Sequence, residues 1–387
     1  MAKQKNNELN LQNEALQKKL RLSSIVIVLL VITLCTVTIV YNNRPPRLPA
    51  PAEPAALPSG EAAESQGDPL SLWSEGAKLK TELTGYIAAV TDPENQDFIP
   101  ENDRIAVFDM DGTILNETDP VYFDHRLLLH RVVDDPDYKD KASDFEKEVA
   151  ADIQSWIDTG KAPDDLPVRH GQAVASAFKG YTIQQFYDYV DNFLALPMPG
   201  YEGMNNGQAF YKPMLQVIDY LNDNGFKVYI VSGTDRLITR AIAAGTVNIP
   251  ARQVIGSDEA LVATGQGDTD GLDYTYQDTD QLILAGTFLV KNVKMNKVDV
   301  IAQEIGQQPV LAFGNTSGDF AMAKYTTTGN KYKALGFMVC CDDLERENGN
   351  LDKAESMVKS CEENGWTPVS MKNDWITIYG EGVTYKK

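Results

Sequence analysis

Short apolar runs alternate with helical apolar stripes along much of this chain. The four apolar residues at 105–108 predict a buried strand, and the runs at 226–231 and 309–313 predict two more. A helix is predicted just before the second run, where apolar residues recur at helical spacing over 214–221 and Gly225 favours its end. Another helix is predicted before the third run, capped by Asn296 and ending at Gly306. Strand–helix alternation of this kind predicts an α/β fold with a doubly wound parallel sheet.

Helical patterns dominate residues 114 to about 205, and aromatic side chains crowd 181–193. The segment between the first two predicted strands is too long for a simple crossover. It therefore predicts an inserted group of helices, and the aromatic cluster is expected to form the core of that insertion. Residues 257–281 are acidic and rich in Gly and Thr, which predicts a loop or a small hairpin.

A long apolar segment lies near the N-terminus. Residues 25–41 carry no charge, and with Ser23 and Ser24 they reach about the length that crosses a bilayer as a helix. Lysines gather before the segment and few basic residues follow it, so 1–22 are expected in the cytoplasm and the bulk of the chain outside. A cleaved signal peptide is the alternative. We thus expect a single-pass protein that contacts lipid through 23–41.

Composition completes the expected organisation. Residues 42–70 are rich in Pro and Ala and predict a linker, which leaves 71–387 as the folded domain. A formal net charge of −20 argues against nucleic acid as a partner, because phosphate backbones are repelled. Three cysteines lie outside the apolar segment: Cys340, Cys341 and Cys361. They are expected either to be buried free thiols or to form one disulfide that joins Cys361 to Cys340 or Cys341.

The strongest chemical signal follows the first predicted strand. Asp109 and Asp111 stand two positions apart, and Gly112 allows a sharp turn directly after them. Ligands of open α/β sheets bind just beyond the carboxyl ends of the strands, where this turn is expected. One carboxylate can attack phosphorus there while its neighbour handles protons.

Three further signals come later in the chain. Ser232 and Gly233 follow the second predicted strand. At this position a side-chain hydroxyl and a backbone N–H can both donate hydrogen bonds to one phosphate oxygen. Asn315 and Asp319 follow the third. Three lysines precede that strand, and each is a candidate to neutralise phosphoryl charge: Lys291, Lys294 and Lys297.

Together these motifs, in this order, resemble those of the haloacid dehalogenase-like superfamily, and the stretch from 211 to 233 resembles its phosphoserine-phosphatase-like branch. The resemblance implies a Rossmann-like core with a helical cap at about 117–205. It implies Asp109 as nucleophile, Asp111 as acid and base, and Lys297 as the motif lysine. Phosphate would be bound by Ser232, Gly233, Thr113 and Lys297. Mg²⁺ would be held by Asp109, Asp111, Asn315 and Asp319.

The expected function is a Mg²⁺-dependent phosphomonoester hydrolase that forms an aspartyl-phosphate on the outer side of the membrane. A phosphotransferase or phosphomutase with the same motifs is an alternative, and so is a non-catalytic tethered binding domain. Asn315 departs from the acidic residue usual in the family, which removes one charge from the metal site. The three histidines, His125, His130 and His170, are expected to be structural or solvent-facing, since the family's chemistry requires none.

Overall fold

The computed structural model describes residues 67–386. The predicted cytoplasmic segment, the predicted membrane helix at 23–41 and most of the predicted linker lie outside these residues. Within 67–386, no helix combines the length and apolar character needed to cross a bilayer. Leu70 is fully buried in the core. The folded domain therefore includes a residue that the sequence pattern had assigned to the linker.

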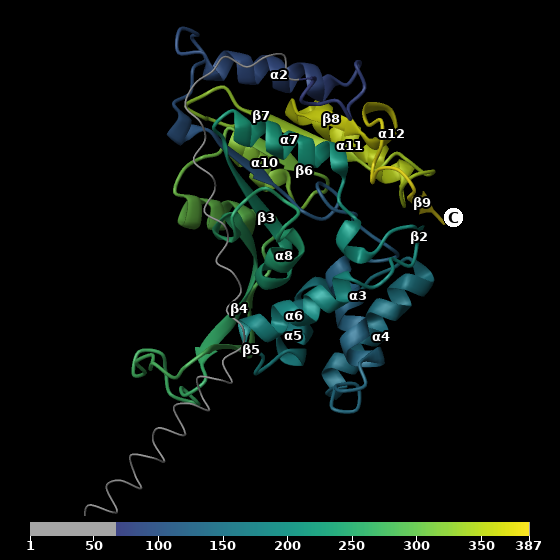
Figure 1. Ribbon diagram of the computed structural model, residues 1–387, viewed down its shortest axis with the longest axis vertical. Helices are drawn as coiled ribbons and strands as arrows, with labels where there is room; N and C mark the ends of the chain where they lie inside the picture. Colours follow the sequence, from purple (N-terminus) through teal and green to yellow (C-terminus); the bar gives the residue numbers. More distant parts are fainter. Residues whose placement is uncertain (1–66, 387) are drawn as a thin grey trace, which may run out of the picture. The chain divides into compact units, whose positions relative to one another are not determined.

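A seven-stranded sheet with the order β5-β4-β3-β1-β6-β7-β8 forms the centre of the domain (Figure 1). Its strands are β1 Ile105–Phe108, β3 Lys227–Asp235, β4 Val254–Ala263, β5 Leu282–Val290, β6 Leu311–Gly314, β7 Leu335–Cys340 and β8 Thr367–Ser370. All neighbours are parallel except β4 and β5. The α/β fold with a mostly parallel sheet is confirmed. A second, two-stranded sheet pairs β2 Tyr201–Glu202 with β9 Thr384–Tyr385.

Helices cover both faces of the large sheet, because alternate strand residues point to opposite sides. Ala106 and Phe108 of β1 belong to the larger core, which includes apolar residues of α2 and α7. Val107 belongs to a second core with residues of α10 and α11. The helices outside the inserted segment are α2 Lys78–Thr91, α7 Lys212–Asp223, α8 Arg236–Ala243, α9 Met295–Val300, α10 Phe320–Thr327, α11 Leu351–Asn364 and α12 Met371–Asp374.

The inserted segment forms a helical cap, as the pattern predicted. Its helices are α3 Phe123–Leu129, α4 Asp144–Thr159, α5 Leu166–Ala177 and α6 Ile183–Leu194, and α3 continues as a π-helical turn at His130–Asp134. They gather as one group in Figure 1. Phe186 and Phe193 of the aromatic cluster are buried, so the cluster does form cap core.

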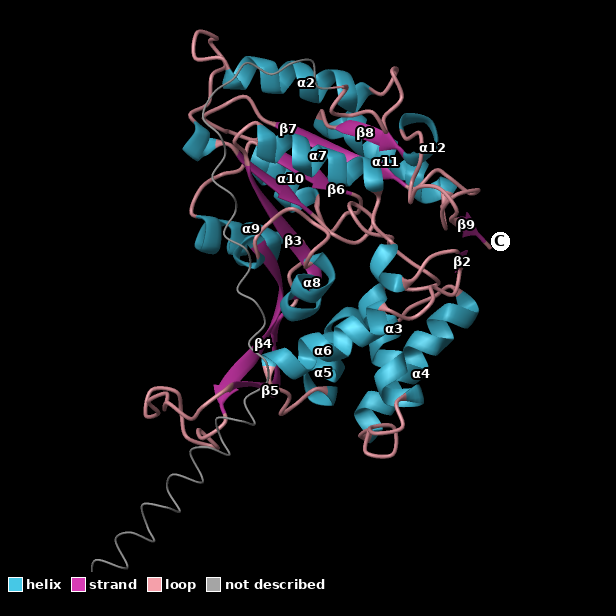
Figure 2. Ribbon diagram, viewed as in Figure 1, coloured by secondary structure: helices cyan, strands magenta, loops and turns pink. Residues whose placement is uncertain are grey.

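The structure corrects the expected edge of the sheet. Residues 264–281 form the expected loop, but residues 257–263 belong to β4, which pairs with β5 in a long two-stranded arm that projects from the sheet (Figure 2). The arm braces the cap, because Leu284 of β5 exchanges backbone hydrogen bonds with Gly180 and Tyr181. Register shifts within this ladder break the simple apolar alternation on which a strand prediction depends.

A second correction concerns the helix before β6. Asn296 was expected to cap it, yet α9 begins at Met295, after Lys294 with a φ of 55°. The Asn296 side chain instead donates a hydrogen bond to the Lys291 carbonyl and so stabilises the preceding turn. The helix continues as a π-helical turn at Ile301–Ile305 and ends at Gly306 as predicted. All three cysteines of the domain are buried free thiols.

Candidate active site

The turn after β1 places both aspartates at the carboxyl end of the sheet. The backbone N–H of Asp109 still belongs to the sheet, because it donates to the Phe313 carbonyl of β6 at 2.9 Å. Gly112 then adopts a φ of 79°, and a Cβ at this position would lie 1.9 Å from the Asn315 side-chain nitrogen. Glycine is therefore required here both by conformation and by space.

Lys297 is the lysine that contacts the nucleophile candidate. Its Nζ donates to Asp109 Oδ1 at 2.6 Å and to Asp319 Oδ1 at 2.7 Å, and the side chain is fully buried. Burial alone would lower the pKa of Lys297, but attraction to the two carboxylates raises it, so the amine stays charged. Lys294 is exposed and Lys291 lines the nearby cavity. Of the three lysines, Lys297 is thus the one whose amine contacts Asp109 and Asp319.

Asp319 and Asn315 differ in how far their oxygens are already engaged. Asp319 Oδ1 accepts from Lys297, and its Oδ2 accepts from the backbone N–H groups of Asn315 and Thr316, each at 3.0 Å. Asn315 Oδ1 is buried and has no hydrogen-bond partner among the described residues. A buried oxygen without a partner is costly unless a ligand satisfies it. Asn315 therefore offers a free oxygen donor, whereas Asp319 holds the lysine and the loop.

The remaining predicted residues also meet at this end of the sheet. Ser232 is fully buried and its Oγ accepts from the Thr234 backbone N–H at 3.0 Å. Thr113 Oγ1 is buried without a partner among the described residues. The sequence pattern did not single out Thr234, whose hydroxyl donates to Asp111 Oδ2 at 2.8 Å. Thr234 is a hydroxyl residue two positions after Ser232 at the end of a strand, and this position was the sequence signal that could have identified it.

A cavity of about 230 Å³ opens over these residues. The core lines one side of it with Asp109, Asp111, Gly233, Thr234, Lys297 and Asp319. The cap lines the other side with Tyr122, Asp124, His125, Trp156 and Leu166. The cap therefore closes over the predicted chemistry and limits the size of what enters.

The two aspartates have shifted protonation equilibria. Burial, and then the nearby Asp319 charge, raise the pKa of Asp109 to about 7. Burial, followed by the charges of Asp124 and Asp109, raises the pKa of Asp111 well above its usual range. Among the described residues, Asp111 makes no ion pair with a lysine or arginine, whereas Asp109 pairs with Lys297. Both carboxyls therefore hold a proton more readily than a solvent-exposed aspartic acid does.

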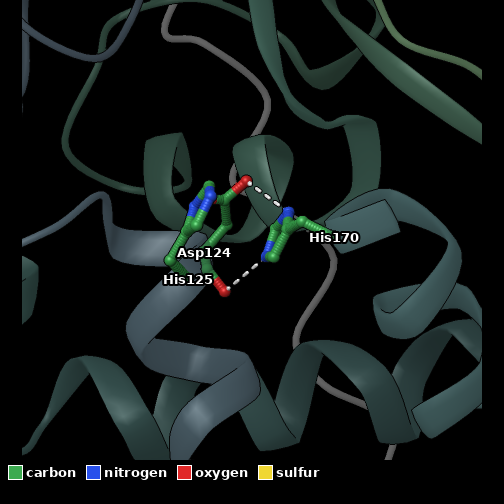
Figure 3. Close-up of side chains that lie close together, drawn as sticks. All are labelled: Asp124, His125 and His170. Carbon is green, nitrogen blue, oxygen red and sulfur yellow. Dashed lines mark hydrogen bonds and ion pairs between the residues drawn. The ribbon is translucent and has the colours of Figure 1, made fainter. Parts of the chain in front are cut away.

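The cap also contributes Asp124, which the sequence analysis did not single out, and two of the histidines that were expected to be structural or solvent-facing. Asp124 and His125 lie in the cavity wall, and His170 is buried beside them (Figure 3). His130 lies apart and half-exposed, 3.8 Å from Asp134. The only sequence signal for the cluster was the adjacent Asp-His pair, because His170 is distant in the chain.

Comparison with known proteins agrees with the motifs. The family model of haloacid dehalogenase-like hydrolases matches residues 106–324, which is more than half of the chain. No curated protein sequence matches the chain.

Several solved structures are similar. A functionally unknown protein from Anaerococcus prevotii is 17% identical, with a TM-score of 0.46 over 80% of this chain and 97% of that one. Cytosolic 5'-nucleotidase IIIB bound to cytidine is 10% identical, with a TM-score of 0.46 over 77% and 88%. A phosphoserine phosphohydrolase-like protein from Francisella tularensis is 12% identical, with a TM-score of 0.35 over 66% and 99%.

Proposed function

Because the chain belongs to the haloacid dehalogenase-like hydrolases, we propose that it is a phosphomonoester hydrolase that forms an aspartyl-phosphate on Asp109. The observation that carries the proposal is the buried ion pair between Lys297 and Asp109 at the floor of the cavity, with Asp111 on the same turn. A nucleophile, a charge-neutralising lysine and an acid thus converge on one small space.

In the first step, the ionised Asp109 carboxylate attacks phosphorus, and the bond from phosphorus to the leaving oxygen breaks. Asp111 donates its proton to that oxygen, which leaves as an alcohol. Lys297 remains charged and offsets the negative charge on the phosphoryl group. In the second step, Asp111 takes a proton from water, which attacks the phosphorus of the aspartyl-phosphate. Inorganic phosphate leaves, and the Asp109 carboxylate is restored.

Phosphate oxygens would be bound by groups at the carboxyl ends of β1 and β3. Thr113 has a buried hydroxyl without a partner in residues 67–386, which suits donation to a phosphate oxygen. Ser232 accepts from the backbone and so keeps its own O–H for donation. Gly233 lines the cavity, and a Cβ there would lie 3.0 Å from Val293. A glycine therefore keeps this wall of the cavity open.

The donor set fits Mg²⁺, the metal that the family implies. Asn315 Oδ1 is a buried oxygen without a hydrogen-bond partner in the described part of the chain, and Asp109 and the main-chain carbonyl of Asp111 add hard oxygen donors. When bound, the ion would neutralise charge between Asp109 and the phosphoryl group. Asp319, with both oxygens engaged, would position Lys297 and the Asn315 loop.

The proposed substrate is a small phosphate ester, because the cavity of about 230 Å³ is closed on one side by the cap. We place the protein in the phosphoserine-phosphatase-like branch on the motif resemblance alone. We also propose that residues 23–41 anchor it in the cell membrane with the catalytic domain on the outer side. The support for this topology is the uncharged segment and the distribution of basic residues around it.

Phosphate release by the full-length chain from a panel of small phosphate esters, with and without Mg²⁺, tests the proposal. Asp109→Asn should abolish release while the protein remains folded, because the change is nearly isosteric. Asp111→Asn should slow both steps and allow a phosphorylated chain to accumulate when the leaving group is good. An Asp109→Asn protein with near wild-type release would refute the mechanism. Transfer to an added alcohol or sugar in place of water would identify a phosphotransferase instead.

A further inference from the structure

Two cap helices bring a carboxylate and two imidazoles together beside the catalytic cavity. Asp124 and His125 are neighbours on α3, and His170 reaches them from α5 (Figure 3). All three side chains are buried, and one potential ligand atom of each lies within 4.8 Å of the other two. None of them has a role in the hydrolysis described above.

The hydrogen bonds of His170 determine which of its nitrogens carries a lone pair. Nε2 lies 3.2 Å from the backbone carbonyl of Asp124, which can only accept, so Nε2 carries the hydrogen. In the neutral ring, Nδ1 then presents a lone pair.

This lone pair faces a second acceptor. Nδ1 of His170 has no hydrogen-bond partner among the described residues and lies 3.7 Å from Asp124 Oδ2. Two buried acceptors that face each other are unfavourable unless a cation or proton lies between them. Two ligand atoms on one tetrahedral metal ion are about 3.4 Å apart, given bonds of about 2.1 Å. The spacing is thus close to that of a metal-bound pair.

The surroundings match those of metal-binding histidines. A ligating imidazole commonly donates its other N–H to a backbone carbonyl or a carboxylate, which fixes its orientation. His170 makes such a bond to the Asp124 carbonyl, and His125 Nδ1 lies 2.7 Å from Asp124 Oδ1. The two rings are stacked, with centroids 3.9 Å apart and planes 3° apart, so one ring must turn about its side-chain torsions before both imidazoles can bind the same ion.

We propose that Asp124, His125 and His170 bind a divalent transition-metal ion such as Zn²⁺, at a site separate from the proposed Mg²⁺ site. Imidazole nitrogen favours transition metals, whereas the oxygen donors around Asn315 favour Mg²⁺. The ion links α3 to α5 and so stabilises the cap. Because Asp124 and His125 line the cavity, its open coordination positions face the space where substrate binds. The site does not depend on the proposed phosphatase activity.

Metal content provides the test. The full-length chain is stripped with a chelator and dialysed against Zn²⁺, or Co²⁺ as a spectroscopic probe, with excess Mg²⁺ to compete at the oxygen-rich site. We expect one transition-metal ion per chain, a Co²⁺ visible spectrum of nitrogen coordination, and a higher melting temperature with Zn²⁺ than with Mg²⁺ alone. His170→Gln should weaken Zn²⁺ binding at least tenfold. The matched control is His130→Gln, which changes a cap histidine outside the cluster and should bind as wild type does.

Anomalous diffraction from wild-type crystals grown with Zn²⁺ keeps the test independent of how the variants fold. A peak between the three side chains supports the site. A peak only at Asp109 and Asn315, no binding in excess Mg²⁺, or equal binding by His170→Gln and wild type would overturn it.

Discussion

Asp109 and Asp111 stand two positions apart on one turn, yet their partners differ. Asp109 pairs with the Lys297 amine, while Asp111 accepts a hydrogen bond from the Thr234 hydroxyl, whose oxygen also lies 3.4 Å from Asp124 Oδ2. A carboxyl with a cationic partner is more easily ionised than a buried one beside other acids. The same turn therefore holds one group suited to attack and one suited to carry a proton, and the difference comes from their neighbours.

Asn315 offers the most direct test of the metal site at the scale of one residue. Asn315→Asp restores a charge where the family usually has one. Added attraction to Mg²⁺ of about 1–3 kcal/mol is expected at an effective dielectric constant of ~20, after desolvation is discounted. The Mg²⁺ concentration for half-maximal phosphate release should fall roughly tenfold. A requirement that is unchanged or higher would place Asn315 outside the metal shell.

Glu259 provides a pH test away from catalysis. Both of its carboxyl oxygens are buried without a hydrogen-bond partner among the described residues. Burial, then the charges of Asp235 and Asp258, raise its pKa to about 9. The folded chain thus keeps a proton that the unfolded chain loses above its ordinary pKa of 4.5. The contribution of Glu259 to the free energy of unfolding should therefore be largest below pH 4.5 and should decrease as the pH rises from there toward about 9.

Glu259→Gln removes this titration. Relative to wild type, it should gain about 1–2 kcal/mol in free energy of unfolding between pH 5 and pH 8, a value discounted for partial exposure. Denaturant unfolding at the two pH values measures the difference. Glu355→Gln, on an exposed helix position, is the control and should leave the pH dependence unchanged. If Glu259→Gln follows wild type at both pH values, the carboxyl of Glu259 is ionised in the folded state.

At the scale of elements, the sequence predicted those strands and helices whose apolar residues recur at a regular spacing. The apolar run before Asp109 and the stripe over 214–221 identified β1 and α7 because burial on fixed sides imposes a period. The β4–β5 arm was missed because its register shifts and its half-exposed positions blur that period. The motif order located Lys297, but not the Asp124 cluster, whose members meet only through the packing of α3 on α5.

Helix α4 allows a prediction for the cap. The Ser143 hydroxyl accepts a hydrogen bond from the Glu146 backbone N–H, and the Glu146 carboxylate accepts one from the Ser143 backbone N–H. Both hydrogen bonds of a capping box are therefore present. Ser143→Ala should lower the free energy of unfolding by about 1 kcal/mol. Ser155→Ala in the same helix, where no cap is made, should cost less. Equal losses from the two substitutions would show that the box adds nothing to stability.

At the scale of the whole molecule, the acidic surface and the site have opposite requirements. A net charge of −20 repels phosphate esters at long range, so binding depends on local positive charge. Lys297 supplies it at the cavity floor, and Lys291 adds a second amine in the wall. The folded domain contains groups that can hold such a substrate, whereas the proposed membrane anchor and its orientation depend on the sequence pattern of residues 1–66.

Topology is the corresponding prediction. Lys3, Lys5, Lys18, Lys19 and Arg21 precede the uncharged segment, and only Arg44 and Arg47 follow closely. The positive-inside bias therefore predicts that the domain beginning near residue 67 faces outward. Protease added to intact cells without an outer barrier should digest the domain and leave a protected N-terminal fragment that includes residues 23–41. Permeabilised cells, in which the fragment before the segment also becomes accessible, are the control. A domain protected in intact cells and digested only after permeabilisation would place the catalytic site in the cytoplasm, where it would meet a different set of phosphate esters.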